Sequence, residues 1–391
     1  MKNEILLNAA EKFGTPSFVF DTDEFARQAD SIKSALGDIP LCFSIKANPF
    51  LLHALPESVS RVEVCSPGEL TICQKLNVKP ETIIYSGVNK GEDDISRAVD
   101  YGAGILTAES RLHVELIDRV CLEKGKKAEV ILRLTSGKQF GIDPDEIIDI
   151  ILNKEKYKAI DFIGLHYYSG TQKKNASVIE KDIRRFEEFI ERLEAECGYV
   201  PRHVEYGPGA AADYFVPPYD EKDNETLQQT AELLKGFAKK NPLTVEMGRF
   251  LASSCGTYLT SVADIKNNLG TNYVICDGGI NHLKYYGQTM AMQVPPIILL
   301  GSDKAYDRSY TLCGSLCTTA DLLVRKVELP ELKIGDVLAF GRCGAYTITE
   351  GTVLFLSRTM PRVMLFSEKD GLRLVRDFYE TFNLNCKKRG N

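Results

Sequence analysis

Between about residues 40 and 250, short runs of β-branched and apolar residues alternate with longer stretches in which apolar residues recur at helical spacing. Each short run predicts a strand, and each stretch between them predicts a helix. The predicted strands are 41–46, 62–65, 82–85, 104–107, 129–134, 161–167, 203–206 and 243–246. The predicted helices are 67–76, 92–101, 109–124, 144–153, 175–196 and 224–240, with a weaker one at 50–58. This alternation favours a (β/α)8 barrel, with a doubly wound open sheet as the alternative.

The pattern changes after residue 250. Short apolar runs separated by turn residues follow one another with almost no helical spacing, as in NYVICDGG, DVLAFG and GTVLFLS. They predict a second, all-β domain, and PSFVFD predicts one earlier strand that could pair with the later sheet. The expected division is an N-terminal segment 1–25 whose strand joins the β-domain, a barrel over 26–252, and a β-domain over 253–391.

Charge and composition narrow the class of protein. The net charge is −6, and acidic and basic residues are interspersed without a Lys/Arg block, which argues against nucleic acid and anionic membrane as partners. The chain start lacks a long apolar core and no run of eighteen apolar residues occurs, so neither a signal peptide nor a membrane span is expected. The eleven cysteines lack Cys-x-x-Cys spacing, which favours reduced thiols in a cytoplasmic protein and no metal site.

Unusual residues cluster where the predicted barrel strands end. Enzymes with this fold carry their chemistry at the C-terminal ends of the strands. Lys46 ends the first strand, His166 and Tyr168 lie at the end of the sixth, and Glu246 ends the eighth. The expected active site is therefore this rim of the barrel.

The loops YGPGAA and EMGR follow the seventh and eighth strands, where such barrels commonly bind phosphate. Gly207, Gly209 and Gly248 allow backbone N–H groups to approach an anion closely, and Arg249 adds a cation. Each glycine could instead simply end a strand. Two glycine-bearing loops, one with an arginine, favour a phosphate site.

A strand-end lysine such as Lys46 is usually a solvated charge or a salt-bridge partner. Beside a phosphate site it has another use, because a partly desolvated amine becomes nucleophilic and can form a Schiff base with an aldehyde. Pyridoxal 5′-phosphate (PLP) is the phosphate-bearing aldehyde cofactor that uses such a lysine. Glu246 could keep the ring nitrogen of PLP protonated, and a helix N-cap or an ion pair is the alternative for this carboxylate.

The chain resembles the fold-type-III PLP-dependent decarboxylases, which include diaminopimelate and ornithine decarboxylases. The resemblance runs nearly end to end, and its motifs occur in the family's order. They are IKAN (45–48), SPGEL (66–70), QFGI (139–142), HYYSGTQ (166–172), EYGPG (205–209), EMGR (246–249), CDGGIN (276–281), GSLCTTAD (314–321) and GAYT (344–347). The resemblance implies an alanine-racemase-like architecture, in which a PLP-binding barrel is followed by a β-domain.

The resemblance also implies roles for single residues. Lys46 would carry the cofactor, Glu246 would face its pyridine nitrogen and Arg133 would lie beneath its ring system. Such enzymes are homodimers in which the loop carrying Cys317 enters the partner's barrel, and this cysteine helps to protonate the carbanion left by carbon dioxide. The implied cofactor-binding residues are Lys46, Arg133, His166, Tyr168, Gly207, Gly209, Glu246, Gly248, Arg249 and Tyr346.

Departures from the family concern the substrate. Thr318 stands where diaminopimelate and ornithine decarboxylases have an acidic residue that recognises the distal amino group, and a neutral hydroxyl offers only a hydrogen bond. Tyr285, with Lys284 beside it, stands where the diaminopimelate enzymes have an arginine. Tyr168 replaces the usual stacking histidine. The substrate-binding residues are expected to be Thr318, Asp321 and Tyr285.

A further departure concerns the expected dimer. Gln139, with Lys138 beside it, replaces a lysine that in the relatives pairs across the dimer with the aspartate numbered Asp321 here. The cross-dimer contact is therefore not expected in its usual form.

The sequence thus predicts a PLP-dependent amino-acid decarboxylase, a carboxy-lyase that releases carbon dioxide from a substrate held as an external aldimine. Its substrate is expected to differ from diaminopimelate and ornithine, and an unusual or carrier-protein-tethered amino acid of a biosynthetic pathway would suit Thr318. The alternatives are an amino-acid racemase of the same fold and a non-catalytic binding protein. Racemases of this fold usually set an arginine against the pyridine nitrogen, so Glu246 argues against that reading.

Overall fold

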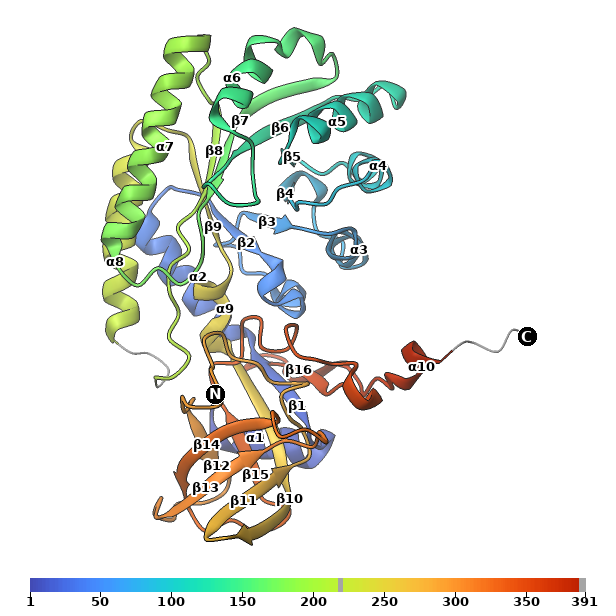
Figure 1. The fold of residues 1–391 in the computed structure, drawn as a ribbon, viewed down its shortest axis with the longest axis vertical. Coiled ribbons are helices and arrows are strands. Elements are labelled where there is room, and N and C mark those ends of the chain that lie inside the picture. The colour runs from blue at the N-terminus through green and yellow to red at the C-terminus, as the bar shows by residue number, and fades with distance from the viewer. Residues whose placement is uncertain (217–220, 387–391) are drawn as a thin grey trace, which may run out of the picture. The chain divides into compact units, whose positions relative to one another are not determined.

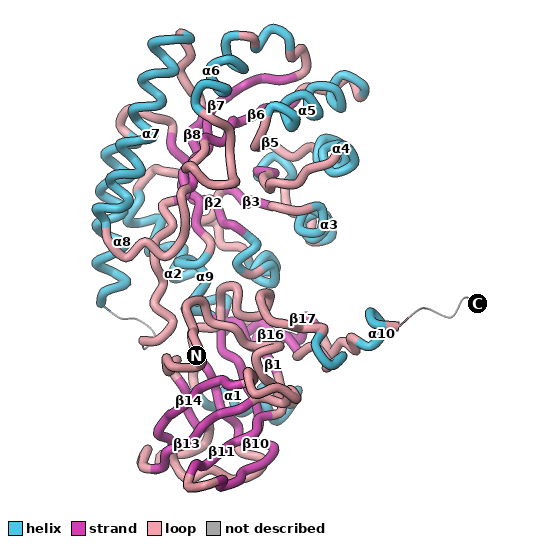
Figure 2. The backbone as a smooth tube through the Cα atoms, in the orientation of Figure 1, coloured by secondary structure: helices cyan, strands magenta, loops and turns pink. Residues whose placement is uncertain are grey.

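The structure is a computed structural model that describes residues 1–216 and 221–386, and it divides into two compact units. Within the described residues, the barrel unit comprises 28–212 and 221–251. The sheet unit comprises 1–27, 213–216 and 252–386. Figures 1 and 2 draw both units.

Eight parallel strands close into a barrel in the barrel unit (Figure 1). The strands are β2 (Leu41–Ser44), β3 (Arg61–Val64), β4 (Ile83–Tyr85), β5 (Ile105–Ala108), β6 (Ala128–Leu134), β7 (Ile160–Tyr168), β8 (His203–Gly207) and β9 (Leu243–Met247). The barrel is closed because β2 pairs with β9 as well as with β3. This confirms the predicted (β/α)8 barrel and excludes an open sheet, in which the first and last strands would not meet in this way.

Helices alternate with these strands along the chain, and the longer ones lie around the outside of the barrel (Figure 2). They are α2 (Thr22–Leu36), α3 (Pro67–Lys75), α4 (Glu92–Tyr101), α5 (Arg111–Glu123), α6 (Pro144–Leu152), α7 (Ala176–Cys197), α8 (Glu221–Ala238) and α9 (Arg249–Ala252). Ser66 caps α3, since its hydroxyl accepts a hydrogen bond from Glu69 N at 3.1 Å. Gly102 and Gly198 end α4 and α7 with φ of 87° and 61°, the left-handed conformation that glycine adopts without strain.

The barrel interior changes from apolar to polar toward the C-terminal ends of the strands. Cys42, Ile84, Ile105, Ile131 and Ile163 come from five strands and form one buried apolar cluster. Alternate residues of a strand share a face, so the residues two positions further along point into the same interior. Four of the five buried residues at these next positions are polar, namely Ser44, Ser86, Thr107 and Arg133, and the fifth is Leu165 on β7. Polar side chains therefore lie above an apolar floor at the mouth of the barrel.

The sheet unit contains a nine-stranded mixed sheet, which confirms the predicted all-β domain. The strand expected at GTVLFLS was wrong, because this segment forms turns and the 3-10 helix Phe355–Ser357. Its strands are β1 (Ser17–Asp21), β10 (Gly256–Asn268), β11 (Thr271–Cys276), β12 (Ile297–Leu299), β13 (Arg308–Cys313), β14 (Leu322–Leu329), β15 (Val337–Phe340), β16 (Arg362–Ser367) and β17 (Gly371–Arg376). β1 pairs antiparallel with β10 and parallel with β16, so the N-terminal strand lies inside a sheet made by the later sequence. Helix α1 (Asn3–Phe13) packs on this sheet through Leu6 and Ala9, and a short helix, α10 (Phe382–Asn385), lies near the end of the described chain.

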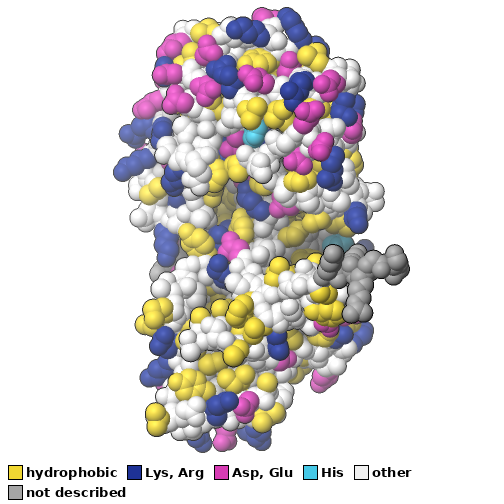
Figure 3. All heavy atoms as spheres, turned by 45° about the vertical axis from the view of Figure 1, so that its right-hand side comes forward, with side chains coloured by type: hydrophobic (Ala, Val, Ile, Leu, Met, Phe, Trp, Pro, Cys, Tyr) yellow, Lys and Arg dark blue, Asp and Glu magenta, His cyan; other side chains and the backbone are white. Residues whose placement is uncertain are grey.

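Charged side chains of both signs share the surface, and the cysteines are unpaired. On the face drawn in Figure 3, acidic and basic side chains are interspersed rather than gathered by sign. All eleven cysteines are free thiols, and the described residues contain no group of three or more His, Cys, Asp or Glu side chains placed to hold a metal. Within the described parts of the chain, no helix has the length and apolar character needed to cross a bilayer.

Candidate active site

Lys46 lies directly beyond β2 at the mouth of the barrel. The strand ends at Ser44, and Lys46 occupies a 3-10 turn, Ile45–Ala47, which precedes the 3-10 helix Pro49–Ala54 found where the weak helix at 50–58 was predicted. Nζ of Lys46 donates to both carboxylate oxygens of Glu63, at 2.8 and 3.1 Å, and lies 3.6 Å from Oε1 of Glu246. Both glutamate side chains are buried, while 36% of the Lys46 side chain is exposed. The amine is thus fixed between two carboxylates and stays open to an incoming ligand.

Glu246 is held by groups from two other strands of the barrel, β2 and β7. Its Oε1 accepts a hydrogen bond from the Ser44 hydroxyl at 2.9 Å, and its Oε2 lies 3.1 Å from Nε2 of His166. Burial would raise the pKa of Glu246, but the Lys46 charge and the His166 hydrogen bond outweigh it and hold the pKa well below its usual range. Glu246 is therefore a stable anion inside the barrel.

Glu205 is a further buried carboxyl group, which the sequence did not single out as a site residue. It lies on β8, in register with His166 on β7, and neither of its oxygens has a hydrogen-bond partner among the described residues. Burial raises the pKa of Glu205 to about 8, with Glu246 and Glu63 acting in the same direction. At neutral pH this group is mostly protonated, so it adds little negative charge beside Glu246.

Arg133 projects into the barrel from β6 and is paired on one side only. Nη1 of Arg133 donates to Glu109, whose other oxygen accepts from Gly141 N at 3.1 Å and so ties the QFGI loop to the barrel. Nε of Arg133 and Nδ1 of His166 are buried and have no hydrogen-bond partner among the described residues. Buried polar atoms are nearly always satisfied, so each of these two atoms is suited to contact a polar ligand.

The two glycine loops form a narrow cradle. A side chain at Gly207 would place its Cβ 2.7 Å from the ring of Tyr168, and one at Gly209 would place it 1.9 Å from the carbonyl oxygen of Gly170. A Cβ at Gly248 would lie 3.2 Å from Ala47, in the turn that carries Lys46. Only glycine fits at the first two positions without displacing these neighbours, and a glycine backbone is also what close approach to an anion requires.

Arg249 follows this cradle and is buried, with 7% of its surface exposed. Its Nε donates to the Thr171 hydroxyl at 3.3 Å, within the HYYSGTQ motif. The barrel unit therefore brings together the predicted lysine, glutamate, histidine, tyrosine, both glycine loops and the arginine. Together with the orphaned donors, this donor set fits PLP: an amine for the aldehyde, an anion for the ring nitrogen, and glycines with a cation for the phosphate.

The sheet unit holds the remaining predicted residues around the loop between β13 and β14. Cys317 is exposed at the tip of this loop, and Thr318 is half-buried. Asp321 is buried, and its two oxygens accept from Ile280 N at 2.9 Å and from Leu316 N at 2.6 Å. Gly279 and Gly314 leave room for this carboxylate, because a Cβ at either position would lie within 2.6 Å of it. Asp321 therefore organises the loop that presents Cys317.

Tyr285 and Lys284 face different surroundings. Tyr285 is buried, and its hydroxyl donates to Gly341 O at 2.7 Å, so this phenol is engaged inside the sheet unit. The side chain of Lys284, by contrast, is exposed. Tyr346 is half-buried with a φ of 66°, in the left-handed region.

Gln139, which stands where relatives have a lysine at the dimer contact, lies on the surface of the barrel unit. Gln139 and Lys138 are both exposed, and Lys138 Nζ donates to Ser169 O at 3.1 Å. The pair therefore sits beside the strand end that carries Tyr168.

Sequence reasoning missed several polar groups of the barrel mouth. Glu63 and Cys65 flank Lys46, with Cys65 Sγ 3.5 Å from its amine, and Lys90 is 4% exposed with a pKa that burial lowers to about 8. A glutamate inside the apolar run RVEV is the signal that could have revealed Glu63, because strand interiors rarely carry an unpaired carboxylate.

The chain matches a known protein family. The model for "Pyridoxal-dependent decarboxylase, pyridoxal binding domain" matches residues 22–253, more than half of the chain. A diaminopimelate decarboxylase of Aquifex aeolicus is 26% identical over 360 residues, covering 87% of this chain and 84% of the relative. An L-glutamyl-[BtrI acyl-carrier protein] decarboxylase of Niallia circulans is 25% identical over 391 residues, covering 93% and 90%.

Solved structures share the fold. Diaminopimelate decarboxylase from M. jannaschii, in complex with L-lysine, matches with a TM-score of 0.86 at 24% identity, covering 99% of this chain and 94% of that one. Lysine/ornithine decarboxylase from Vibrio vulnificus, complexed with putrescine, matches with a TM-score of 0.80 at 22% identity, covering 94% and 98%. At these identities the likeness concerns the fold.

Proposed function

Because the chain belongs to the pyridoxal-dependent decarboxylases, we propose that it removes the α-carboxylate of an amino acid whose distal end bears no free amino group. The activity class is PLP-dependent amino-acid decarboxylation. What we propose is the role of each residue and the kind of amino acid that serves as substrate. The observation that carries it is the Lys46 amine, held between Glu63 and Glu246 and partly exposed at the mouth of the barrel.

Lys46 is the residue that would hold the cofactor aldehyde. PLP, when bound, supplies a sink for the electron pair left behind by the departing carboxylate. Glu246 supports this chemistry because it stays anionic and can keep a proton on a ring nitrogen placed against it. Ser44 and His166 orient Glu246 through its two oxygens, so its carboxylate has one fixed direction.

The phosphate would be held by backbone N–H groups of the Gly207–Gly209 loop and by Gly248, with Arg249 as the cation and Tyr346 as a further donor. The close approaches at Gly207 and Gly209 support this assignment. Arg133, through its orphaned Nε, would lie beneath the ring system, and the Tyr168 ring would stack where relatives use histidine.

Proton return to the α-carbon is assigned to Cys317. Its thiol is exposed on a loop that Asp321 holds in place, which suits a donor serving a site on another subunit. We therefore assign the active form as a homodimer in which each Cys317 loop completes the partner's site. Dimerisation itself is a proposal that a sedimentation experiment would test.

The class of substrate is inferred from Thr318. A carboxylate at position 318 would pair with a distal ammonium group, but the hydroxyl of Thr318 cannot. The relative from Niallia circulans acts on a glutamyl group on an acyl-carrier protein, which supports a tethered amino acid for this chain.

A substrate panel tests the function. PLP-loaded protein is offered free diaminopimelate, ornithine, lysine, arginine and glutamate in both stereochemical forms, and glutamate loaded on a carrier protein, with carbon dioxide release as readout. We expect release from the tethered amino acid and background rates from the free ones. Efficient turnover of a free diamino acid would contradict the substrate assignment while leaving the decarboxylase class intact.

A further inference from the structure

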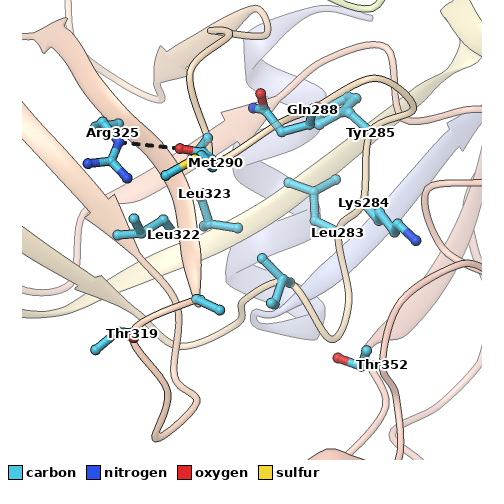
Figure 4. A pocket seen from close by; sticks show the side chains of 13 residues that line it. Leu283, Lys284, Tyr285, Gln288, Met290, Thr319, Leu322, Leu323, Arg325 and Thr352 are labelled. Atoms are coloured by element: carbon cyan, nitrogen blue, oxygen red, sulfur yellow. Dashed lines mark hydrogen bonds between the residues drawn. The ribbon is translucent and has the colours of Figure 1, made fainter.

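A pocket of about 520 Å³ opens in the sheet unit beside the Cys317 loop (Figure 4). It lies between the segment that carries Lys284 and the start of β14, and Thr319 and Ala320 of the loop line it directly. Thr318 is linked to this wall, since its hydroxyl accepts from Ala320 N at 3.3 Å. The pocket therefore adjoins the residues assigned above to the substrate.

The pocket wall is apolar with cations at its edges. Figure 4 shows Leu283 and Leu323 between Arg325 on one side and Lys284 on the other. Arg325 is partly engaged, because its Nε donates to Met290 O at 3.3 Å, whereas the Lys284 side chain is exposed. No Asp or Glu is among the described residues that line the pocket.

Size and charge exclude a simple amino-acid side chain as occupant. Pockets of roughly 300–1,000 Å³ hold ligands of the size of a cofactor fragment, and this volume lies inside that range. A distal ammonium group would find two like charges and no carboxylate, so a diamino acid is disfavoured. A long neutral chain that ends in an anion fits, because the apolar wall contacts the chain and Lys284 faces the anion.

We propose that this pocket holds the phosphopantetheine arm of a thioester-linked substrate, with its phosphate at Lys284 and its methyl-bearing end against Leu283 and Leu323. Gln288, Thr319 and Thr352 also line the pocket, and their polar groups would serve the two amide groups of the arm. This assignment rests on the proposed function, in which the Cys317 loop serves the reaction. The same arm occurs on carrier proteins and on coenzyme A.

The first test measures binding of free 4′-phosphopantetheine to the PLP-loaded protein by calorimetry. Lys284→Glu reverses the edge charge, and Ala320→Trp fills the pocket from an exposed loop position. Lys369→Glu, at an exposed position that does not line the pocket, is the matched control. We expect each pocket variant to weaken binding by about tenfold or more, since hydrogen bonds to charged groups have this magnitude, and the control to leave it unchanged.

Several outcomes would overturn the proposal. One is an absence of saturable binding to the wild-type protein, and another is equal binding by all three variants. A third is loss of dimerisation in Ala320→Trp with unchanged phosphopantetheine binding, which would make the pocket a subunit contact.

The second test separates the pocket from the reaction. With glutamate loaded on a carrier protein, Lys284→Glu should raise KM by about tenfold and leave kcat and the cofactor absorbance band unchanged, and Lys369→Glu should behave as the wild type. Turnover of the loaded carrier with equal KM in all variants would remove the pocket proposal and keep the proposed function. The opposite outcome is also possible: the pocket variants abolish phosphopantetheine binding, but no loaded carrier is turned over. That outcome would keep the pocket proposal and remove the proposed function. Glutamyl-coenzyme A assayed in parallel distinguishes the two sources of the arm.

Discussion

The Ser44 hydroxyl donates a hydrogen bond to Oε1 of Glu246 over 2.9 Å, and this bond joins the first strand of the barrel to the last. The two residues are 202 positions apart in sequence, and they meet because β2 pairs with β9. The anion proposed to face the cofactor ring is therefore oriented by the closure of the barrel itself. An open sheet with the same strands would leave Glu246 without this partner.

Ser44→Ala should weaken both the fold and the binding of the cofactor. A hydrogen bond to a charged group contributes about 1.5–3 kcal/mol, so we expect a loss of this order in unfolding free energy and a roughly tenfold loss in PLP affinity. Ser60→Ala is the control, since the Ser60 hydroxyl bonds a backbone oxygen, Leu41 O, at 3.2 Å and lies away from Glu246. Fluorescence titration with PLP measures the effect, and equal affinities in both variants would show that Ser44 does not orient Glu246.

The raised pKa of Glu205 predicts that the free energy of unfolding falls as the pH rises. Its folded pKa, about 8, lies above the value of an unfolded glutamate, so the folded state keeps a proton that the unfolded state loses. The loss of stability begins once the pH exceeds the pKa of the unfolded glutamate. It grows through neutral pH and levels off once the pH exceeds the pKa of Glu205 in the folded protein.

Glu205→Gln removes this penalty because the amide cannot ionise. The Tm difference between the variant and the wild type should grow from about pH 5 to about pH 8, where the shifted pKa lies, and then stay constant. Glu129→Gln, at an exposed position on β6, provides the control and should give no such trend. A Tm difference that does not change with pH would mean that Glu205 is ionised in the folded protein.

How much the sequence could predict depended on whether a feature is local. The alternation of strands and helices is encoded within a few residues of each element, and it was predicted. The lysine, the glutamate and the glycine loops were found because each stands at a strand end, where barrels carry chemistry. The partners of Lys46 were not predicted, because Glu63 lies mid-strand and its role depends on which face of β3 turns inward. The pairing of Ser44 with Glu246 needs the closed barrel and could not be seen in either segment alone.

Two glycines should respond to alanine in opposite ways. Gly207→Ala would place a Cβ 2.7 Å from the Tyr168 ring, so we expect lower stability and at least a tenfold loss of PLP affinity as the ring is displaced. Gly236→Ala, in α8, meets no atom within 4 Å and should stabilise the fold by up to about 1 kcal/mol through helix propensity. Thermal unfolding and PLP titration measure both. A Gly207→Ala protein that binds PLP normally would show that the Tyr168 ring is not fixed by this contact.

Cys317→Ala tests proton return separately from cofactor binding. A positioned proton donor contributes about 10²–10⁴-fold, so kcat should fall by about a hundredfold while the absorbance band of bound PLP is unchanged. Cys386→Ala, which removes the other exposed thiol, is the matched control and should behave as the wild type. Turnover in deuterated water adds a second readout, because protonation from water in place of the thiol should lower the stereochemical purity of the labelled product. A Cys317→Ala enzyme with the same rate and the same labelling pattern as Cys386→Ala would assign the proton to another donor.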